Sequence, residues 1–237
     1  MFVSGVVQAT PDKLRSSYSV MKYHKEGSAC GRIPYDPVSS ESDYRYSFCF
    51  NRTDRIIHKG AGKMKKIEEY VRSIPDFPEP GIIFRDVTSI LQDPDGLKLS
   101  IDLIQEKLEG LDFDVIAGTE SRGFIFGVPV AYNLHKAFVP VRKKGKLPCE
   151  TVSMDYDLEY GTATIEMHKD AIKPGQKVVL VDDLIATGGT MEAAARLVEE
   201  LGGKVVKIIF LIELAGLKGR EKLAKYDVAS VICYDGK

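Results

Sequence analysis

Short apolar runs alternate with segments of helical spacing from Met64 onward, and this alternation restricts the fold more than any other feature. The run 114–118 (DVIAG) is almost wholly apolar, as is typical of a strand buried on both faces of a sheet. In contrast, 97–110 (LKLSIDLIQEKLEG) has helical spacing and ends at a glycine. The alternation predicts an α/β domain with a mostly parallel, twisted sheet flanked by helices. Further strands are expected at 137–141, 178–182, 205–213 and 228–234, and further helices at 123–134, 190–201 and about 216–225.

Two stretches interrupt this alternation. Residues 142–168 begin with a basic run and end in a strand of alternating polarity (162–168), which predicts an antiparallel flap. Residues 65–74 have the pattern of a short amphipathic helix, and 74–86 (IPDFPEPGIIFRD) follow it. Three prolines and a glycine make 74–86 unsuitable for a helix interior or a central strand, so we expect an ordered loop there.

Residues 1–63 differ in composition from the rest. They hold ten Lys and Arg against six Asp and Glu, a charge of 10 − 6 = +4, and show no sustained apolar period. We interpret them as a disordered extension, or as a mis-assigned upstream segment with Met64 as the true start. A folded N-terminal module is the alternative. Residues 64–237 are expected to form the functional domain.

Composition excludes several classes of function. The formal net charge of −1 gives no general affinity for nucleic acids or anionic membranes. The chain has no apolar run of roughly 20 residues, the length of a membrane span. The four cysteines and four histidines are dispersed, without the spacing of a disulfide framework or metal site. We therefore expect free thiols and a cytoplasmic location.

The stretch 178–190 (VVLVDDLIATGGT) places a glycine pair directly before a helix. The first turn of a helix leaves N–H groups unpaired, and its dipole is positive there. Gly188 and Gly189 allow a ligand close to the backbone, while Thr187 and Thr190 add hydroxyl donors. The loop is therefore suited to a phosphate monoester. A plain strand-turn-helix corner is the alternative.

Asp182 and Asp183 cannot bind the same phosphate, because their charges would repel it. They can accept hydrogen bonds from neutral hydroxyls, and a ribose carries two vicinal hydroxyls near its 5′-phosphate. The stretch can thus hold a ribose 5-phosphate. A capped corner with a surface Asp pair stays open, whereas no other acid or histidine cluster supports a metal site. The P-loop and dinucleotide-binding glycine patterns are both missing from the chain.

These residues resemble a known family. The stretch 178–190 is similar to the signature with which type I phosphoribosyltransferases bind phosphoribosyl diphosphate (PRPP). The surrounding segments resemble the adenine phosphoribosyltransferases, in the same order, over about 64–234. Those segments are 74–91, 118–127, 141–148, 156–175 and 213–223.

The resemblance implies a type I phosphoribosyltransferase fold with a small hood and an antiparallel flexible flap. The implied reaction belongs to purine salvage: adenine and PRPP give AMP and pyrophosphate. PRPP would arrive as its Mg²⁺ complex, with no metal site in the protein itself. The implied assembly is a homodimer.

The resemblance also assigns residues to each part of the substrates. Asp182 and Asp183 would hold the ribose, and the loop that follows would hold the 5′-phosphate through Ala186, Thr187, Gly188, Gly189 and Thr190. Pyrophosphate would be bound by Ser121, Arg122 and Gly123, and by the basic run through Arg142, Lys143 and Lys146. A solvated basic turn is the alternative for that run.

Glu159 is the implied catalytic residue, in a mobile loop with Tyr160 beside it. A carboxylate next to the purine could accept its proton. Without the resemblance, Glu159 would read as an ordinary surface glutamate. Adenine would lie between Leu184 and a hood formed by Ile83, Phe84 and Arg85, although Phe84 alone also fits a core anchor.

Two rival functions remain at this point. One is a PRPP-binding regulator without catalysis, joined to an N-terminal DNA-binding module. Residues 1–63 show no two-helix apolar pattern for such a module. The other is an enzyme of the same fold that uses xanthine or another 6-oxopurine.

Overall fold

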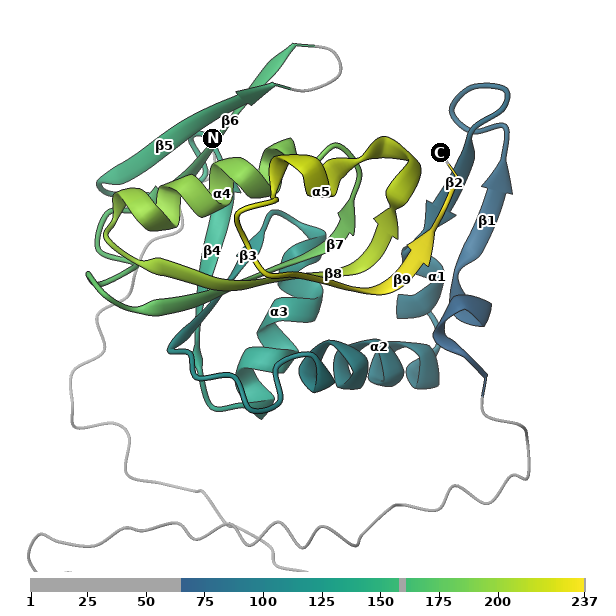
Figure 1. Cartoon of the computed structure of the whole chain (residues 1–237), viewed down its shortest axis with the longest axis horizontal. Coiled ribbons are helices and arrows are strands. Elements are labelled where there is room, and N and C mark those ends of the chain that lie inside the picture. Colours follow the sequence, from purple (N-terminus) through teal and green to yellow (C-terminus); the bar gives the residue numbers. More distant parts are fainter. Residues whose placement is uncertain (1–64, 158–160, 237) are drawn as a thin grey trace, which may run out of the picture. The chain divides into compact units, whose positions relative to one another are not determined.

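The computed structural model describes residues 65–157 and 161–236. The interpretation of residues 1–63 therefore lies outside the described residues. Within them, a seven-stranded sheet forms the centre of the domain, with strand order β5-β6-β4-β3-β7-β8-β9 (Figure 1). Five of these strands are parallel: β4 (Ala137–Lys143), β3 (Val115–Thr119), β7 (Lys177–Ile185), β8 (Lys204–Leu214) and β9 (Val228–Tyr234). The predicted α/β class and mostly parallel sheet are confirmed.

The predicted flap is the antiparallel end of this sheet. β6 (Thr162–His168) pairs with the end of β4, and β5 (Thr151–Asp157) pairs along the whole of β6. Figure 1 shows the two strands rising together above α4 (Gly189–Glu200). The flap therefore begins at the sheet edge and leads to the segment that carries Glu159.

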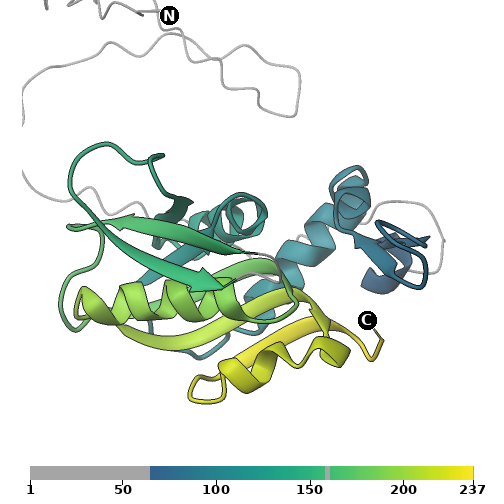
Figure 2. The same ribbon diagram turned by 90° about the horizontal axis from the view of Figure 1, so that it is seen from above.

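Helices cover both faces of the sheet, and the central strand explains why. In β7, Val178 and Leu180 pack in the cluster that includes α4, while Val179 and Val181 pack in the cluster that includes helices on the other face. Those helices are α2 (Pro94–Glu106) and α3 (Arg122–Asn133) (Figures 1 and 2). A strand segment buried on both faces must be apolar, as this one is from Val178 to Val181.

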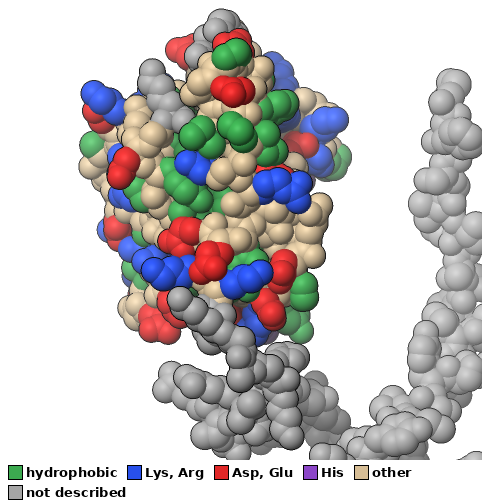
Figure 3. All heavy atoms as spheres, turned by 90° about the vertical axis from the view of Figure 1, so that its right-hand side faces the viewer, with side chains coloured by type: hydrophobic (Ala, Val, Ile, Leu, Met, Phe, Trp, Pro, Cys, Tyr) green, Lys and Arg blue, Asp and Glu red, His purple; other side chains and the backbone are tan. Residues whose placement is uncertain are grey.

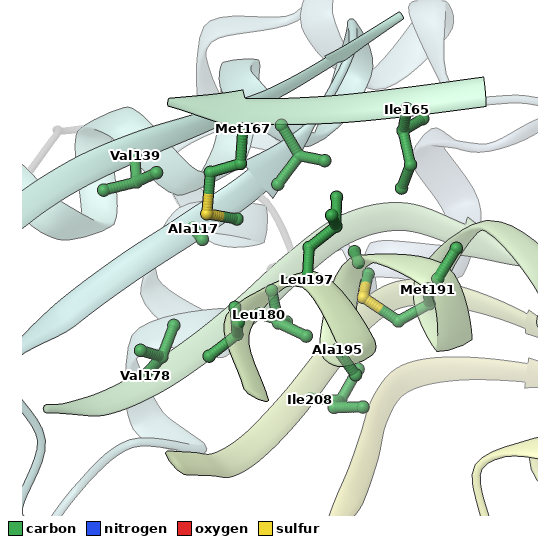
Figure 4. Close-up of a cluster of buried hydrophobic side chains, with 14 of the residues drawn as sticks. Ala117, Val139, Ile165, Met167, Val178, Leu180, Met191, Ala195, Leu197 and Ile208 are labelled. Atoms are coloured by element: carbon green, nitrogen blue, oxygen red, sulfur yellow. The ribbon is translucent and has the colours of Figure 1, made fainter. Parts of the chain in front are cut away.

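The cluster on the α4 side is drawn in Figure 4. Met191 and Leu197 of α4 lie close to Leu180 and Ile208 of the two central strands. Leu180, Leu197 and Ile208 are each 0% exposed. This dense packing holds α4 against the sheet.

The hood is a separate two-stranded antiparallel sheet, β1 (Arg72–Pro75) and β2 (Ile83–Asp86). The expected helix over 65–74 is therefore wrong: only a 3₁₀ turn (Ile67–Tyr70) forms before β1. The expected loop over 74–86 is likewise ordered into strand at both ends. Pairing between residues distant in sequence, such as Ile74 with Phe84, overrides the local helical pattern.

The face of the molecule on the hood side mixes apolar and charged side chains (Figure 3). Phe77 is 51% exposed, and Ile83 is 41% exposed. Large exposed apolar groups of this kind often mark a binding surface. None of the helices in the described part of the chain combines the length and hydrophobicity of a membrane span.

The helix expected at about 216–225 is also wrong. The structure has a 3₁₀ turn (Ala215–Leu217) and then the single turn α5 (Gly219–Lys222). Lys218 lies between them with a φ of 56°, in the left-handed region, which stops any continuous helix. α5 follows β8 and lies beside the start of α4 (Figure 1).

Candidate active site

A pocket of about 460 Å³ opens at the carboxyl ends of the parallel strands β3 and β7. This is the edge at which open α/β sheets bind their ligands. Its lining comes from the loop after β3 and the start of α3, the ends of β4 and β7, the start of α4 and the flap strand β5. The lining residues are Glu120, Ser121, Arg122, Lys143, Tyr156, Asp182, Asp183, Leu184 and Thr190.

The loop before α4 has the geometry of an anion-binding turn. Gly188 is the N-cap residue with a φ of 80°, and its carbonyl accepts a hydrogen bond from Glu192 N at 3.0 Å. Among the described residues, no side chain caps the helix. The first amides of α4 are thus available to an anion, and Thr190 of this turn lines the pocket.

Asp182 and Asp183 lie at the end of β7, next to this turn. Asp183 is only 4% exposed, and its amide donates to Asp182 Oδ1 at 2.9 Å. Arg122 Nε lies 2.6 Å from Asp183 Oδ2, but its N–H does not point along a hydrogen-bond direction. Asp183 Oδ2 is therefore buried beside a cation while still lacking a hydrogen bond from the described residues.

The two carboxyl groups are difficult to ionise together. Burial raises the pKa of Asp182 well above its usual value, and the neighbouring charge of Asp183 raises it further. Burial also raises the pKa of Asp183, against the opposing effect of the Arg122 guanidinium. Asp182 therefore has the more strongly raised pKa of the two, because the Arg122 guanidinium opposes the shift only at Asp183.

Gly123 has a packing role that its sequence position did not reveal. An added Cβ would meet Val181 O at 2.7 Å and Thr119 Oγ1 at 3.0 Å, and Asp182 Oδ1 at 3.1 Å. The first turn of α3 therefore packs directly against the end of β7. This contact places Arg122 close to Asp183.

Glu120 is a site residue that the sequence reading missed. Its carboxylate accepts from Arg142 Nε and Nη2, both at 3.3 Å, and from Lys143 N at 2.9 Å. The hydrogen bond from Arg142 holds the pKa of Glu120 below its usual value. Its position directly after β3, at the carboxyl edge of the sheet, was the signal that could have identified it.

The residues of the basic run, Arg142, Lys143 and Lys146, have different environments. Lys143 lines the pocket, whereas Arg142 is paired with Glu120. The amide of Lys146 donates to Glu166 Oε1 at 3.0 Å, and Lys146 does not line the pocket. The run is thus partly a structured turn and partly a pocket wall.

Tyr156 was also missed, although it lines the pocket from β5. Its place at the end of the flap, three residues before Glu159, was the available signal. Glu159 and Tyr160 themselves lie outside the described residues.

The hood residues do not reach this pocket. The Phe84 ring meets that of Phe77 edge-on with centroids 5.3 Å apart. The Arg85 guanidinium lies 3.8 Å from the centroid of the Tyr234 ring and also donates to Ser73 Oγ. Of the four residues expected at the base, only Leu184 lines the pocket.

No group of three or more His, Cys, Asp or Glu side chains in the described ranges is arranged to hold a metal ion. Divalent cations bound by protein alone usually need several such oxygen ligands. A Mg²⁺ ion that enters with its substrate needs fewer ligands from the protein.

Comparison with known proteins gives the family. The model of the phosphoribosyl transferase domain matches residues 86–234. The adenine phosphoribosyltransferase of Lachnoclostridium phytofermentans is 79% identical over 174 residues, 73% of this chain and 100% of that protein.

Solved structures agree with this match. The adenine phosphoribosyltransferase of Thermoanaerobacter pseudethanolicus is 56% identical with a TM-score of 0.68, over 71% of this chain and 98% of that one. The Saccharomyces cerevisiae enzyme, crystallised with adenine and an imino-altritol bisphosphate, is 41% identical with a TM-score of 0.66, over 70% and 96%. The chain therefore belongs to the adenine phosphoribosyltransferase family.

Proposed function

We propose that this chain catalyses the transfer of the 5-phosphoribosyl group from PRPP to adenine, giving AMP and pyrophosphate in purine salvage. The observation that carries the proposal is that Asp182 and Asp183 line one pocket together with Thr190, in the first turn of α4. A sugar phosphate needs hydroxyl acceptors and an anion site a few ångströms apart, and this pocket offers both. Family membership supplies the identity of the base.

The ribose 5-phosphate part would bind at the end of β7. Asp183 Oδ2 is a buried acceptor to which none of the described residues donates, so a ribose hydroxyl would satisfy it. Asp182 would take the neighbouring hydroxyl. The 5′-phosphate would lie against the loop formed by Ala186, Thr187, Gly188, Gly189 and Thr190.

Pyrophosphate would bind at the start of α3. Ser121, Arg122 and Lys143 line the pocket opposite the α4 loop, and the Gly123 amide lies in the same turn. Charge builds on pyrophosphate as the bond to ribose breaks, so cations there act most strongly in the transition state. Arg142 would support this wall through Glu120, and Lys146 would stay near its rim.

Glu159 would act at the base, with Tyr160 beside it. The ribose carbon gains positive character as pyrophosphate leaves, and the purine must lose its N9 proton as it attacks. A carboxylate at this point can accept that proton. Closure of the flap over the pocket would keep out water, which otherwise hydrolyses PRPP.

Adenine would lie between Leu184 and the hood. Leu184 is already at the pocket wall, while Ile83 and Phe84 lie on β2. The side chain of Arg85 is engaged with Tyr234, so we propose that Arg85 contributes main-chain groups to base recognition.

Three further properties are part of the proposal. Mg²⁺ would enter as the PRPP complex, with Asp182 and Asp183 near it, and would neutralise the diphosphate. The enzyme would work in the cytoplasm. It would form a homodimer, since α3 exposes Ile125 (39%), Val128 (46%) and Tyr132 (84%) at helical spacing, an apolar stripe suited to a second copy.

The proposed reaction is tested by supplying each base in turn. Protein, PRPP and Mg²⁺ are mixed with radiolabelled adenine, hypoxanthine, guanine or xanthine, and nucleotides are separated. We expect AMP from adenine and little product from the 6-oxopurines. Product from a 6-oxopurine alone would change the substrate assignment, and no nucleotide from any base would favour the regulator.

We propose that residues 64–237 contain the whole catalytic unit. The Lachnoclostridium phytofermentans relative is matched over its whole length by 174 residues of this chain. A version that starts at Met64 should therefore keep a kcat/KM close to that of the full chain. An inert or insoluble product would show that residues 1–63 are needed.

Replacing Glu159 with alanine tests its place in the chemistry. Glu159→Ala should lower kcat by about 100-fold or more, because a proton acceptor is lost, with a much smaller change in PRPP affinity. Stopped assays and PRPP titration measure the two quantities. Glu150→Ala, which removes an exposed flap glutamate, is the matched control and should change neither. Equal losses in kcat and PRPP affinity for Glu159→Ala would argue against this role.

Asp182→Asn should separate stability from binding. Since burial and Asp183 raise the pKa of Asp182, the wild-type protein loses stability as pH rises from the usual carboxyl pKa to that raised value. Asparagine cannot ionise, so the variant should gain about 2–4 °C in Tm at about pH 8 and less at about pH 5, while binding AMP more weakly.

Thermal unfolding across this pH range checks the prediction. Asp170→Asn, at an exposed position, should shift the Tm little at any pH. A variant at Asp182 that is less stable than wild type even at the alkaline end would contradict the charge argument.

A further inference from the structure

The segment that follows β8 has no part in the proposed chemistry, yet it lies directly behind the phosphate-binding loop. It comprises the 3₁₀ turn and α5, and Glu213 near the end of β8 contacts it. Figure 1 shows α5 next to the start of α4, and the two helices are in contact. Its contacts point toward a role in setting the position of that loop.

The backbone at Gly219 packs directly against the backbone of the loop at Ala186 and Gly188, as the position of an added Cβ at each glycine shows. A Cβ at Gly219 would lie 2.3 Å from Ala186 O and 2.7 Å from Ile185 Cγ1. In the reverse direction, a Cβ at Gly188 would lie 2.5 Å from Gly219 O. Neither position tolerates a side chain unless a backbone moves. The turn at Gly219 therefore limits where the loop from Ala186 to Gly188 can lie.

Hydrogen bonds from Arg220, the next residue, fix the position of the backbone at Gly219. Arg220 Nε and Nη2 donate to the two carboxylate oxygens of Glu213 at 2.6 and 2.7 Å. Arg220 also donates to Val228 O at 2.8 Å and to Ser230 Oγ at 3.1 Å. One guanidinium thus joins α5 to both β8 and β9, the last two strands of the sheet.

Glu213 is well placed to hold such a pair. It is 7% exposed, and it accepts a further hydrogen bond from Ser230 Oγ at 2.5 Å. The Arg220 hydrogen bond holds the pKa of Glu213 below its usual value, so it stays ionised near neutral pH. A two-point Arg–carboxylate pair fixes orientation as well as distance.

We propose that Arg220 and Glu213 are positioning residues for the 5′-phosphate of PRPP and AMP, acting through the contact of Gly219 with the loop at Ala186 and Gly188. This inference rests on the proposed function of that loop. The pair touches no substrate; it keeps the loop amides at the distance that a phosphate requires. Misplacing such donors by an ångström can reduce activity by about 100-fold.

The test compares the same substitution at two glycines. Gly219→Ala places a methyl group against the loop backbone and should raise the KM for PRPP and the Kd for AMP by about tenfold or more. The KM for adenine should change by less than about twofold, because the base does not use this loop. Gly203→Ala is the control: its methyl would lie 2.7 Å from Ile172 Cγ2, at the far end of α4.

Both alanine variants should unfold at lower temperature, but only Gly219→Ala should weaken binding of the phosphate. Equal PRPP and AMP affinities in wild type and Gly219→Ala would overturn the proposal. So would a parallel loss for adenine and PRPP, which would indicate general damage to the fold.

Variants of the pair give an independent measurement that avoids a steric clash. Arg220→Lys keeps the charge but loses the two-point geometry, and Glu213→Gln keeps the shape but loses the charge. Each should raise the Kd for AMP and for ribose 5-phosphate by a similar factor, and the double variant should be no worse than the worse single one. Strictly additive losses, or losses for adenine alone, would overturn the proposal.

The wild-type protein separates this inference from the proposed function. If wild type makes no AMP and binds neither AMP nor ribose 5-phosphate, the function assigned to the loop is wrong. If wild type is active and the variants match it, only the positioning role is wrong.

Discussion

Two carboxylates at the buried end of the central strand are the constraint around which this site is organised. Their repulsion would be relieved by moving either side chain into water, but β7 is clamped between helices on both faces. Arg122 stabilises Asp183 and leaves Asp182 with a strongly raised pKa. In the proposed function, a ribose that donates hydroxyls to both carboxylates would supply the hydrogen bonds that these buried oxygens need.

The elements that hold the proposed phosphate loop differ from those that would supply the catalytic group. The loop rests on α4 and α5, which are tied to the sheet by the apolar cluster and by the Arg220–Glu213 pair. The flap reaches the pocket from the opposite edge through Tyr156. In the proposed function, the substrate phosphate would therefore be positioned by the more tightly packed part of the fold, where small displacements matter most.

The residue pattern predicted correctly those elements whose structure depends mainly on residues that are neighbours in sequence. A fully apolar strand, a glycine pair and a helix start are neighbours in sequence, so the residue pattern of 178–190 was enough to interpret that stretch. The hood strands depend on pairing across about ten residues, and the helix at 65–74 was wrong for that reason. The helix at 216–225 failed because Lys218 adopts a left-handed conformation and Gly219 packs against a distant loop. Glu120 and Tyr156 line the same pocket only because the folded sheet brings the ends of β3, β5 and β7 to it.

Pairing of charges also changes how the basic run should be interpreted. The sequence suggests a strongly positive pocket, but Glu120 neutralises Arg142, and Asp183 faces Arg122. Lys143 lines the same pocket as Asp182 and Asp183. A highly charged diphosphate therefore cannot be held by net charge alone. In the proposed reaction, directional amides at α3 and α4, together with a divalent cation carried by the substrate, would supply the rest.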